Sequence, residues 1–409
     1  MSHPEAAGTD LPRGSNNRIV ANGFRGSWAD LTGPSLPAVA AVLAERQLEA
    51  AGAAWEHVKS PGELLIVGAG RVSHDQAQEL QRDGFDVVRG ERIDPTSRQR
   101  EHLAGRLWLL TSGSTGRPKQ VAHTFQSLTT VASDQPPRRW LCPYSPGAYA
   151  WWQVVTLSLA HPGQDVVFVE ASELDRWPEL ALAEGVTAAS GTPTFWRQAL
   201  WRSAQNVAEL PLEQITLGGE PVDQSILDRL TTLFPTSLIS WIYASSEAGA
   251  SIAVHDGRAG FPVAWLDRAE AGRPLLAVQQ GELLIKSAWS ANGFDGLLRT
   301  GDRAEIVDDR VHITGRIASD EINVGGSKAS ASTIRGVLLA HPAVVWASVR
   351  GRRAPIVGSV VAADVVLDSP ASEADITSWC AQRLPDYSVP RRLRFLDEIP
   401  IKETLKSDV

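Results

Sequence analysis

The chain has 409 residues, of which 43% are hydrophobic and 21% are charged, and its formal net charge is −8. This composition is typical of a globular protein that is long enough for two or three domains. The negative charge argues against nucleic acid or an anionic membrane surface as the main partner, because both select clustered lysine and arginine. No run of 18 apolar residues occurs, so no membrane span is expected.

Cysteine usage and the N-terminus indicate the compartment. Cys142 and Cys380 are far apart and lack CxxC spacing, so neither a disulfide framework nor a zinc site is predicted. Residues 1–17 lack the basic and apolar regions of a signal peptide and are expected to form a disordered tail. These features predict a cytoplasmic protein.

The predicted elements of the first 317 residues alternate between helix and strand. Residues 38–53 have helix composition, and the strands predicted over 63–69 and 85–88 flank a helical pattern over 73–84. Further apolar runs alternate with helical segments such as 223–233. This alternation predicts an α/β fold with layered sheets; the runs are "DVVFV", "ITLGG" and "SLISWIYAS".

The alternation of predicted helices and strands changes near Gly315, where a second domain is predicted. A compact helix over about 331–340 precedes two strands, "AVVWASVR" and "IVGSVVAADVV". A helix over 373–384 and a strand, "RRLRFL", follow. These elements predict a small α+β domain over residues 318–409, appended to a large domain over residues 18–317.

The stretch "TSGSTGRPK", residues 111–119, combines features that suit a polyphosphate. Gly113 and Gly116 allow positive φ, so several backbone N–H groups can point into one concavity. Hydroxyl side chains add donors, and Lys119 adds a positive charge. The alternative is a solvated Ser/Gly linker. The loop is not the P-loop of kinases and GTPases, because GxxxxGK[ST] is absent.

Several motifs in order resemble the adenylate-forming superfamily of acyl- and aryl-CoA ligases, nonribosomal peptide adenylation domains and luciferases. The glycine loop resembles the phosphate loop of that superfamily, and "LGGEPV" its adenine-binding segment. The motifs that follow are "YASSE" (243–247), "RTGD" (299–302), "GRIASDEINVGGSK" (315–328) and "PIKETLK" (400–406). The resemblance implies a large ATP- and acid-binding domain with a mobile C-terminal domain, and the α/β fold class agrees with it.

The resemblance implies which residues bind ATP and Mg²⁺. Tyr243 would stack on adenine, Glu247 would ligate Mg²⁺, and Asp302 and Arg316 would contact the ribose. Lys119 would hold the β- and γ-phosphates together with the hydroxyl and N–H groups of its loop. The implied nucleotide-binding residues also include Thr111, Ser112, Gly113, Ser114, Thr115, Gly116, Gly218, Gly219, Glu220, Pro221, Ala244, Ser245 and Ser246.

The small domain carries the other implied roles. Lys406 would bridge the acid and the α-phosphate during adenylation, and would be catalytic together with Glu247 and Lys119. Asp320 is the implied hinge, with Ser319 or Glu321 as alternatives. Gly325 and Gly326 would let a pantetheine arm pass close to the backbone, although a tight turn between strands would also explain them.

The acid pocket is expected near aromatic residues, because flat indole faces favour an aromatic or unsaturated acid. Core packing explains any one of these tryptophans equally well. The candidate residues are Tyr149, Trp151, Trp152, Thr192, Trp196 and Gly218.

Three departures from the superfamily's pattern bear on substrate and acceptor. About 110 residues precede the phosphate loop, fewer than most relatives carry. Leu405 occupies the position of a glycine, and "ASASTIR" after "GGSK" replaces the usual Pro and Glu-x-Glu. The sequence predicts an AMP-forming ligase that joins a small acid to CoA. Transfer to a carrier protein or an amine, activation of another oxyanion, and a non-catalytic nucleotide-binding relative are the alternatives.

Overall fold

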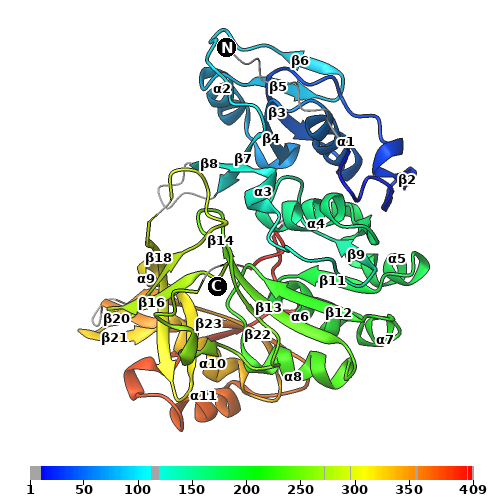
Figure 1. The fold of residues 1–409 in the computed structure, drawn as a ribbon. Helices are drawn as coiled ribbons and strands as arrows, with labels where there is room; N and C mark the ends of the chain where they lie inside the picture. Colours follow the sequence, from blue (N-terminus) through cyan, green and yellow to red (C-terminus); the bar gives the residue numbers. More distant parts are fainter. Residues whose placement is uncertain are drawn as a thin grey trace. The chain divides into compact units, whose positions relative to one another are not determined.

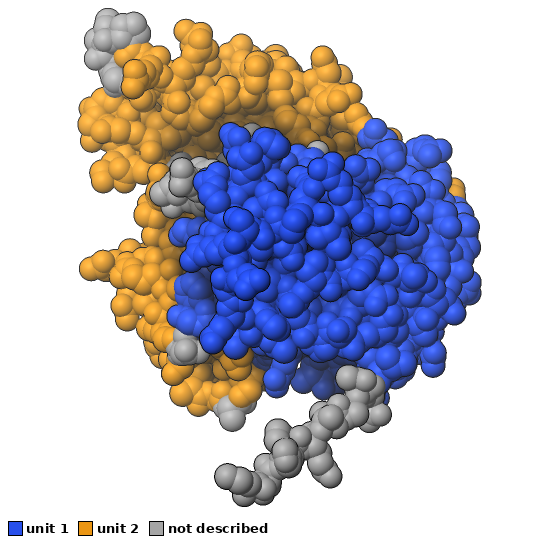
Figure 2. All heavy atoms as spheres, turned by 90° about the horizontal axis from the view of Figure 1, so that it is seen from above, with its two compact units in different colours: residues 1–189, 245–249, 289–295 blue, residues 190–244, 250–288, 296–409 orange. Residues whose placement is uncertain are grey.

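The computed structural model describes residues 11–111, 119–270, 272–294, 296–354, 358–402 and 404–407. Contacts between Cα atoms divide the chain into two compact units, which Figure 2 shows in blue and orange. Unit 1 comprises residues 1–189, 245–249 and 289–295. Unit 2 comprises residues 190–244, 250–288 and 296–409.

A six-stranded sheet in unit 1 has the strand order β6-β5-β3-β4-β7-β8 (Figure 1). Its central strands are parallel, whereas β6 and β8 pair antiparallel at the two edges. Strands β3 and β4 are almost continuously apolar and buried, as is typical of parallel strands covered on both faces. The elements are β3 (Val39–Ala44), α1 (Gln47–Lys59), β4 (Glu63–Gly68), α2 (His74–Arg82), β5 (Asp86–Arg89), β6 (Arg92–Asp94), β7 (Arg106–Thr111) and β8 (Lys119–Thr124).

A second set of strands in unit 1 is mainly parallel. Strand β1 pairs with β10, β10 with β9, and β9 with β11, all in parallel, while β2 forms an antiparallel hairpin with β1. The elements are β1 (Arg18–Ala21), β2 (Phe24–Ser27), α3 (Phe125–Leu128), β9 (Arg138–Cys142), α4 (Tyr149–Ala160), β10 (Gln164–Phe168), α5 (Trp177–Ala183) and β11 (Ala188–Gly191).

Unit 2 begins with α/β structure and continues into a five-stranded sheet of order β15-β19-β18-β17-β16. Strand β12 is parallel to β13, and the five-stranded sheet is antiparallel throughout. The elements are α6 (Pro193–Arg202), α7 (Ala204–Ala208), β12 (Gln214–Gly218), α8 (Gln224–Leu233), β13 (Leu238–Ser245), β14 (Gly249–Val254), β15 (Phe261–Pro262), β16 (Leu275–Gln279), β17 (Glu282–Lys286), β18 (Leu298–Val307) and β19 (Arg310–Arg316).

The C-terminal part of unit 2 has its own core. Helices α10 and α11 pack on one face of the three-stranded sheet β22-β23-β24, around buried residues such as Ile334, Val361 and Ile376. A two-stranded hairpin, β20-β21, precedes this core. The elements are α9 (Ile317–Asp320), β20 (Glu321–Val324), β21 (Ser327–Ser330), α10 (Ala331–Leu339), β22 (Val344–Ala354), β23 (Gly358–Leu367), α11 (Glu373–Ala381) and β24 (Arg392–Phe395).

The α/β fold class predicted from the alternating pattern is confirmed, with one local error. The strands predicted over 63–69 and 85–88 appear as β4 and β5, with α2 between them. The helix predicted over 38–53 is wrong in its first half, because Val39–Ala44 is the strand β3. Its alanine-rich sequence has helix composition, but a strand buried on both faces needs only small apolar side chains.

His57 on α1 generates a prediction about stability and pH. Burial lowers the pKa of His57 to about 4, from an ordinary value near 6.5, because the charged ring would lose its hydration. The unfolded chain therefore binds a proton first as the pH falls, which destabilises the folded state. Between about pH 7.5 and about pH 5, we expect His57 to remove about 2 kcal/mol from the free energy of unfolding.

Urea unfolding at these two pH values, followed for the wild type and for His57→Leu, measures this contribution. The variant should lose less stability on acidification than the wild type does. Equal losses in the two proteins would show that His57 is hydrated or already charged in the folded state.

Candidate functional site

Strands β7 and β8 frame the glycine loop in unit 1. They are antiparallel, and Thr111 and Lys119 form the last cross-strand pair before the connection between them. The residues that carry most of the phosphate-binding prediction lie outside the described part of the chain: Ser112, Gly113, Ser114, Thr115 and Gly116. Thr111, at the end of β7, is partly buried, and Lys119, at the start of β8, is exposed.

The segment Tyr243–Glu247 follows the buried part of β13, and the chain passes from unit 2 to unit 1 after Ala244. In unit 1, Ser245 Oγ accepts a hydrogen bond from the N–H of Ala248 at 2.9 Å. The carbonyl of Glu247 accepts from the N–H of Ala291, also at 2.9 Å. These bonds fix the backbone around Glu247, whose side chain is partly buried.

His123 supports the same segment and was not predicted from the sequence. It is fully buried on β8, with Nε2 2.7 Å from the carbonyl oxygen of Ser246 and Nδ1 2.9 Å from Ser127 Oγ. A carbonyl only accepts, so Nε2 carries a proton and donates it. Burial lowers the pKa of His123, which keeps the ring neutral. Its place in the strand "KQVAHT" gave no signal that its ring contacts the segment that contains Glu247.

The structure places most of the predicted aromatic pocket residues in the core. Trp151, Trp152 and Trp196 have at most 1% of their surface exposed. Trp151 donates from Nε1 to Gln47 at 2.8 Å and stacks edge-on against Trp152. Tyr149 differs, because it is partly buried and its ring centroid lies 6.0 Å from that of His123.

A polar cluster in unit 2 joins three residues from separate motifs. Asp302 on β18 and Arg316 on β19 are cross-strand partners, and Arg316 Nε lies 3.1 Å from Asp302 Oδ1. The hydroxyl of Tyr243 donates to Asp302 Oδ2 at 2.5 Å. Burial and the charge of Asp302 raise the pKa of Tyr243, so the phenol stays protonated and remains a donor.

Glu282 on β17 is a second residue that sequence reasoning missed. Its buried carboxylate accepts from the N–H of Gly301 at 2.9 Å and pairs with Arg299. Gly301 has a φ of +73°, a conformation that side chains disfavour. Glu282 therefore fixes the irregular part of β18 next to Asp302, and only the tertiary pairing of β17 with β18 reveals this.

The segment Leu405–Ser407 lies against Gly219 and Glu220 in unit 2. A Cβ atom at Gly219 would lie 3.1 Å from Cε and 3.5 Å from Nζ of Lys406, and Gly219 has a φ of +83°. Thr192 Oγ1 donates to the carbonyl of Leu405. Glu220 accepts from the N–H of Ser407 at 3.1 Å and from the N–H of Thr194 at 3.0 Å. The structure thus brings Lys406 to Gly219 and Glu220.

Asp320, Gly325 and Gly326 occupy the region between β19 and the small-domain core. Asp320 is buried, contacts Arg303 on β18 at 3.3 Å, and accepts from the N–H of Ser332 at 2.7 Å. Gly325 and Gly326 form the two-residue turn of the β20–β21 hairpin, with φ of +58° and +92°. A two-residue turn of this type requires positive φ at both positions. This requirement alone explains why both residues are glycine.

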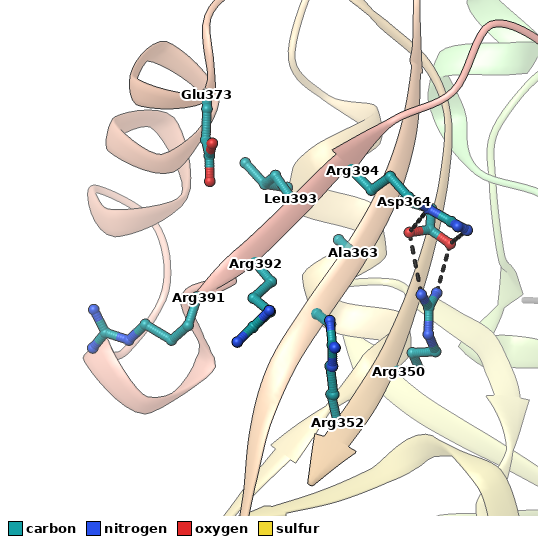
Figure 3. Close-up of a pocket in the computed structure, with 10 residues that line it drawn as sticks. Arg350, Arg352, Ala363, Asp364, Glu373, Arg391, Arg392, Leu393 and Arg394 are labelled. Atoms are coloured by element: carbon teal, nitrogen blue, oxygen red, sulfur yellow. Dashed lines mark hydrogen bonds and ion pairs between the residues drawn. The ribbon is translucent and has the colours of Figure 1, made fainter. Parts of the chain in front are cut away.

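The outer face of the small-domain sheet carries a groove of about 280 Å³ that is rich in arginine (Figure 3). Arg350 and Arg394 converge on Asp364, at 2.6 and 2.7 Å, whereas Arg391 points away from it. Among the described residues, Arg352 and Arg392 have no carboxylate partner. Five arginines and two carboxylates line the groove, so it carries an excess of positive charge on an acidic protein: Arg350, Arg352, Arg391, Arg392, Arg394, Asp364 and Glu373.

A divalent cation would need ligand atoms from a bound nucleotide in addition to those of the protein. The described residues contain no group of three or more His, Cys, Asp or Glu side chains arranged for a metal ion. One carboxylate, such as that of Glu247, fits Mg²⁺ bound mainly by phosphate and water oxygens. The described residues also contain no helix with the length and apolarity that crossing a membrane requires.

Comparison with known proteins identifies the family. Residues 37–294 match the AMP-binding enzyme family, and residues 334–406 match the AMP-binding enzyme C-terminal domain. The chain belongs to the AMP-binding enzyme family. The resemblance found in the sequence motifs is thereby confirmed.

Relatives within the family include named CoA ligases. A 2-succinylbenzoate–CoA ligase of Bacillus licheniformis is 28% identical over 328 residues, which are 71% of this chain and 66% of that protein. The long-chain-fatty-acid–CoA ligase FadD13 of Mycobacterium tuberculosis is 26% identical over 73% of this chain and 65% of its own length. The match thus spans slightly less than two thirds of these relatives.

Solved structures share the fold of the chain over nearly its whole length. The anthranilate CoA ligase AuaEII in complex with anthranoyl-AMP aligns with a TM-score of 0.71, at 17% identity, over 97% of this chain and 93% of that chain. The amide bond synthetase McbA of Marinactinospora thermotolerans aligns with a TM-score of 0.69, at 19% identity, over 96% and 95%.

Leu405 yields a prediction about the terminal segment. It occupies the glycine position of the family motif and has a φ of +61°, yet its side chain is completely buried. A glycine would relieve about 1 kcal/mol of backbone strain but would lose about 2–5 kcal/mol of buried side-chain packing. We therefore expect Leu405→Gly to loosen the segment that carries Lys406, and Leu405→Asn, which tolerates positive φ, to loosen it as well.

Hydrogen exchange at residues 402–407 measures the effect, because the N–H of Leu405 donates to the carbonyl of Lys402 at 2.8 Å. Both variants should exchange faster than the wild type in this segment and normally in β22. Slower exchange in Leu405→Gly would show that backbone strain outweighs packing at this position.

Proposed function

We propose that the protein activates a small aromatic carboxylic acid with ATP and transfers the acyl group to CoA. The observation that carries this proposal is the placement of Lys406 beside Gly219, in a chain whose Tyr243, Asp302 and Arg316 form one polar cluster. These residues belong to motifs that the family uses for ATP. The names of relatives, which include 2-succinylbenzoate and anthranilate ligases, support an aromatic acid.

The first half-reaction is a displacement at phosphorus. A carboxylate oxygen of the acid attacks the α-phosphorus of ATP, and the bond to the bridging oxygen of pyrophosphate breaks. Asp302 would hold the ribose hydroxyls, since a carboxylate accepts several hydrogen bonds and this one lies beside Tyr243 and Arg316. Lys406 would stabilise the charge that builds between the acid and the α-phosphate.

The phosphates of ATP would be bound by a second group of motif residues. Lys119 and the backbone of its loop would hold the β- and γ-phosphates, and Glu247 would hold Mg²⁺, which neutralises phosphate charge when bound. His123 would position Glu247 indirectly, by fixing the carbonyl of Ser246. Because the ring is neutral and buried, it adds no positive charge that would compete for the carboxylate.

The second half-reaction would pass the acyl group to a thiol. The sulfur of CoA attacks the carbonyl carbon of the mixed anhydride, AMP leaves with the electron pair, and a thioester forms. The groove lined by Arg352 and Arg392 suits the phosphates of CoA, because guanidinium groups bind phosphate oxygens in paired hydrogen bonds. The turn at Gly325 and Gly326 stays a candidate for the pantetheine path, and Asp320 for the hinge.

Pyrophosphate exchange into ATP, measured with a panel of acids, tests adenylation whatever the acceptor is. We expect an aromatic acid to support exchange and Lys406→Ala to reduce it by roughly a hundred- to a thousand-fold, the usual cost of losing a charged transition-state contact. Lys402→Ala removes the same charge from the same segment and serves as the matched control. Exchange at wild-type rates in Lys406→Ala would exclude the proposed role of Lys406.

Charge reversal in the arginine groove tests the acceptor. We expect Arg352→Glu and Arg392→Glu to raise the KM for CoA by roughly ten- to a hundred-fold, because each loses a charge-assisted hydrogen bond, while exchange stays unchanged. Arg353→Glu is the matched control, since neighbouring residues of β22 point to opposite faces of the sheet.

An unchanged KM for CoA in both groove variants would remove the groove from the CoA site. The McbA relative indicates the second candidate acceptor, an amine. If the wild type forms adenylate but no CoA thioester, an amine or a carrier-protein thiol takes the place of CoA.

A further inference from the structure

The segment Leu405–Ser407 places one exposed residue between two buried ones. Leu405 is completely buried and Ser407 is 8% exposed, whereas Lys406 is exposed. A Cβ atom at Gly219 would lie 3.1 Å from Cε of Lys406, so the lysine uses space that a glycine leaves open. The segment lies outside the helices and strands, and contacts with other elements therefore have to hold its backbone.

Glu220, which follows β12, bridges this segment and the start of α6. Its Oε1 accepts from the N–H of Ser407 at 3.1 Å, and its Oε2 accepts from the N–H of Thr194 at 3.0 Å. Ser407 and Thr194 are both buried. Loss of the carboxylate would therefore leave two backbone N–H groups without their acceptor at positions that water reaches poorly.

Helix α6 offers N–H groups for such contacts, because the first four of an α-helix have no acceptor within the helix. Thr194 is the second residue of α6, where the positive end of the helix dipole also favours a carboxylate. Thr192 accepts from the N–H of Phe195 at 3.1 Å and donates its own hydroxyl to the carbonyl of Leu405. The residues at the start of α6 thus hold the segment on the N-terminal side of Lys406 as well.

The side chain of Ser407 adds further contacts on the C-terminal side of Lys406. Trp346 on β22 donates from Nε1 to Ser407 Oγ at 3.0 Å, and Thr194 Oγ1 lies 3.1 Å from the same oxygen. The neighbour of Trp346, Val345, accepts at its carbonyl from Arg197 on α6 at 3.0 Å. Ser407 is therefore anchored through its backbone by Glu220 and through its hydroxyl by two other elements.

We propose that Glu220 is a positioning residue that holds Lys406 beside Gly219 for adenylate formation. Its place in "LGGEPV" implied a contact with the nucleotide, yet each of its carboxylate oxygens accepts from a backbone N–H group. Glu220 acts on the reaction through the N–H of Ser407, which fixes the residue next to the lysine. The kinetic part of this inference rests on the proposed function, and the structural part does not.

Hydrogen exchange tests the structural part. Glu220→Ala removes both acceptor oxygens, and we expect amide hydrogen exchange to become roughly ten-fold faster or more at residues 404–407 and at the start of α6. Glu220→Gln keeps one acceptor oxygen and should give a smaller increase. Glu209→Ala, at an exposed glutamate that follows α7, is the matched control and should leave both segments unchanged.

Pyrophosphate exchange tests the kinetic part. We expect Glu220→Ala to lower kcat by roughly ten- to a hundred-fold with little change in the KM for ATP, because Lys406 acts on charge that builds in the transition state. Glu220→Gln should restore part of the rate, and Glu209→Ala should match the wild type. A raised KM for ATP at unchanged kcat would overturn the inference and identify Glu220 as a direct nucleotide contact.

A double-mutant cycle shows whether the carboxylate acts through the lysine. In the Lys406→Ala background, Glu220→Ala should cause no further loss of pyrophosphate exchange, because no ammonium group is left to position. Losses that multiply in the double variant would contradict the positioning role, since the two residues would then act independently.

The outcomes separate this inference from the proposed function. If no acid supports pyrophosphate exchange in the wild type, the proposed function fails, and hydrogen exchange in Glu220→Ala still decides whether the carboxylate holds the segment. Unchanged hydrogen exchange at residues 404–407 in a folded Glu220→Ala protein overturns the inference whatever the activity is. If Glu220→Ala does not fold, Glu220→Gln decides by the same two measurements.

Discussion

The carboxylate of Glu220 ties the end of the chain to the body of unit 2. One oxygen accepts from the N–H of Thr194, at the start of α6, and the other accepts from the N–H of Ser407. Neighbouring contacts from Thr192 and Trp346 complete the attachment. Lys406 lies between two anchored residues, Leu405 and Ser407. The backbone from which its side chain extends is therefore held in place beside Gly219. Without this attachment, Lys406 would be a solvated side chain on a segment outside helices and strands.

Charge pairing has different purposes in different parts of the molecule. Glu63 in β4 is almost completely buried and serves the fold, because it accepts from Trp108, from Arg100 and from the N–H of Leu103. Asp302 is also paired, with Tyr243 and Arg316, yet it is the residue that we propose binds the ribose. The number of hydrogen-bond partners therefore does not distinguish a structural carboxylate from a functional one. Its position in a family motif does.

The resemblance implies that residues of two separate motifs lie close together, and the structure brings these residues to neighbouring strands. "RTGD" and "GRIASDE" are predicted as neighbours by resemblance, and the pairing of β18 with β19 places Asp302 opposite Arg316. Sequence reasoning was less informative for aromatic residues. Trp151, Trp152 and Trp196 have the composition of a pocket wall, yet they fill the core, because indole rings serve burial and ligand contact equally well.

The sequence by itself determined the family, the fold class and the order of the nucleotide-binding motifs, because these depend on short local patterns and on hydrophobic periodicity. It also located the small-domain helices and strands. Only the tertiary structure decided which polar groups meet: His123 with the carbonyl of Ser246, Glu282 with the N–H of Gly301, and Arg197 with Asp223. These partners are separated by between 19 and 123 positions along the chain, and no local pattern encodes such pairings. The physical reason is that burial and distance, which set the strength of each charge interaction, exist only once the strands and helices have packed.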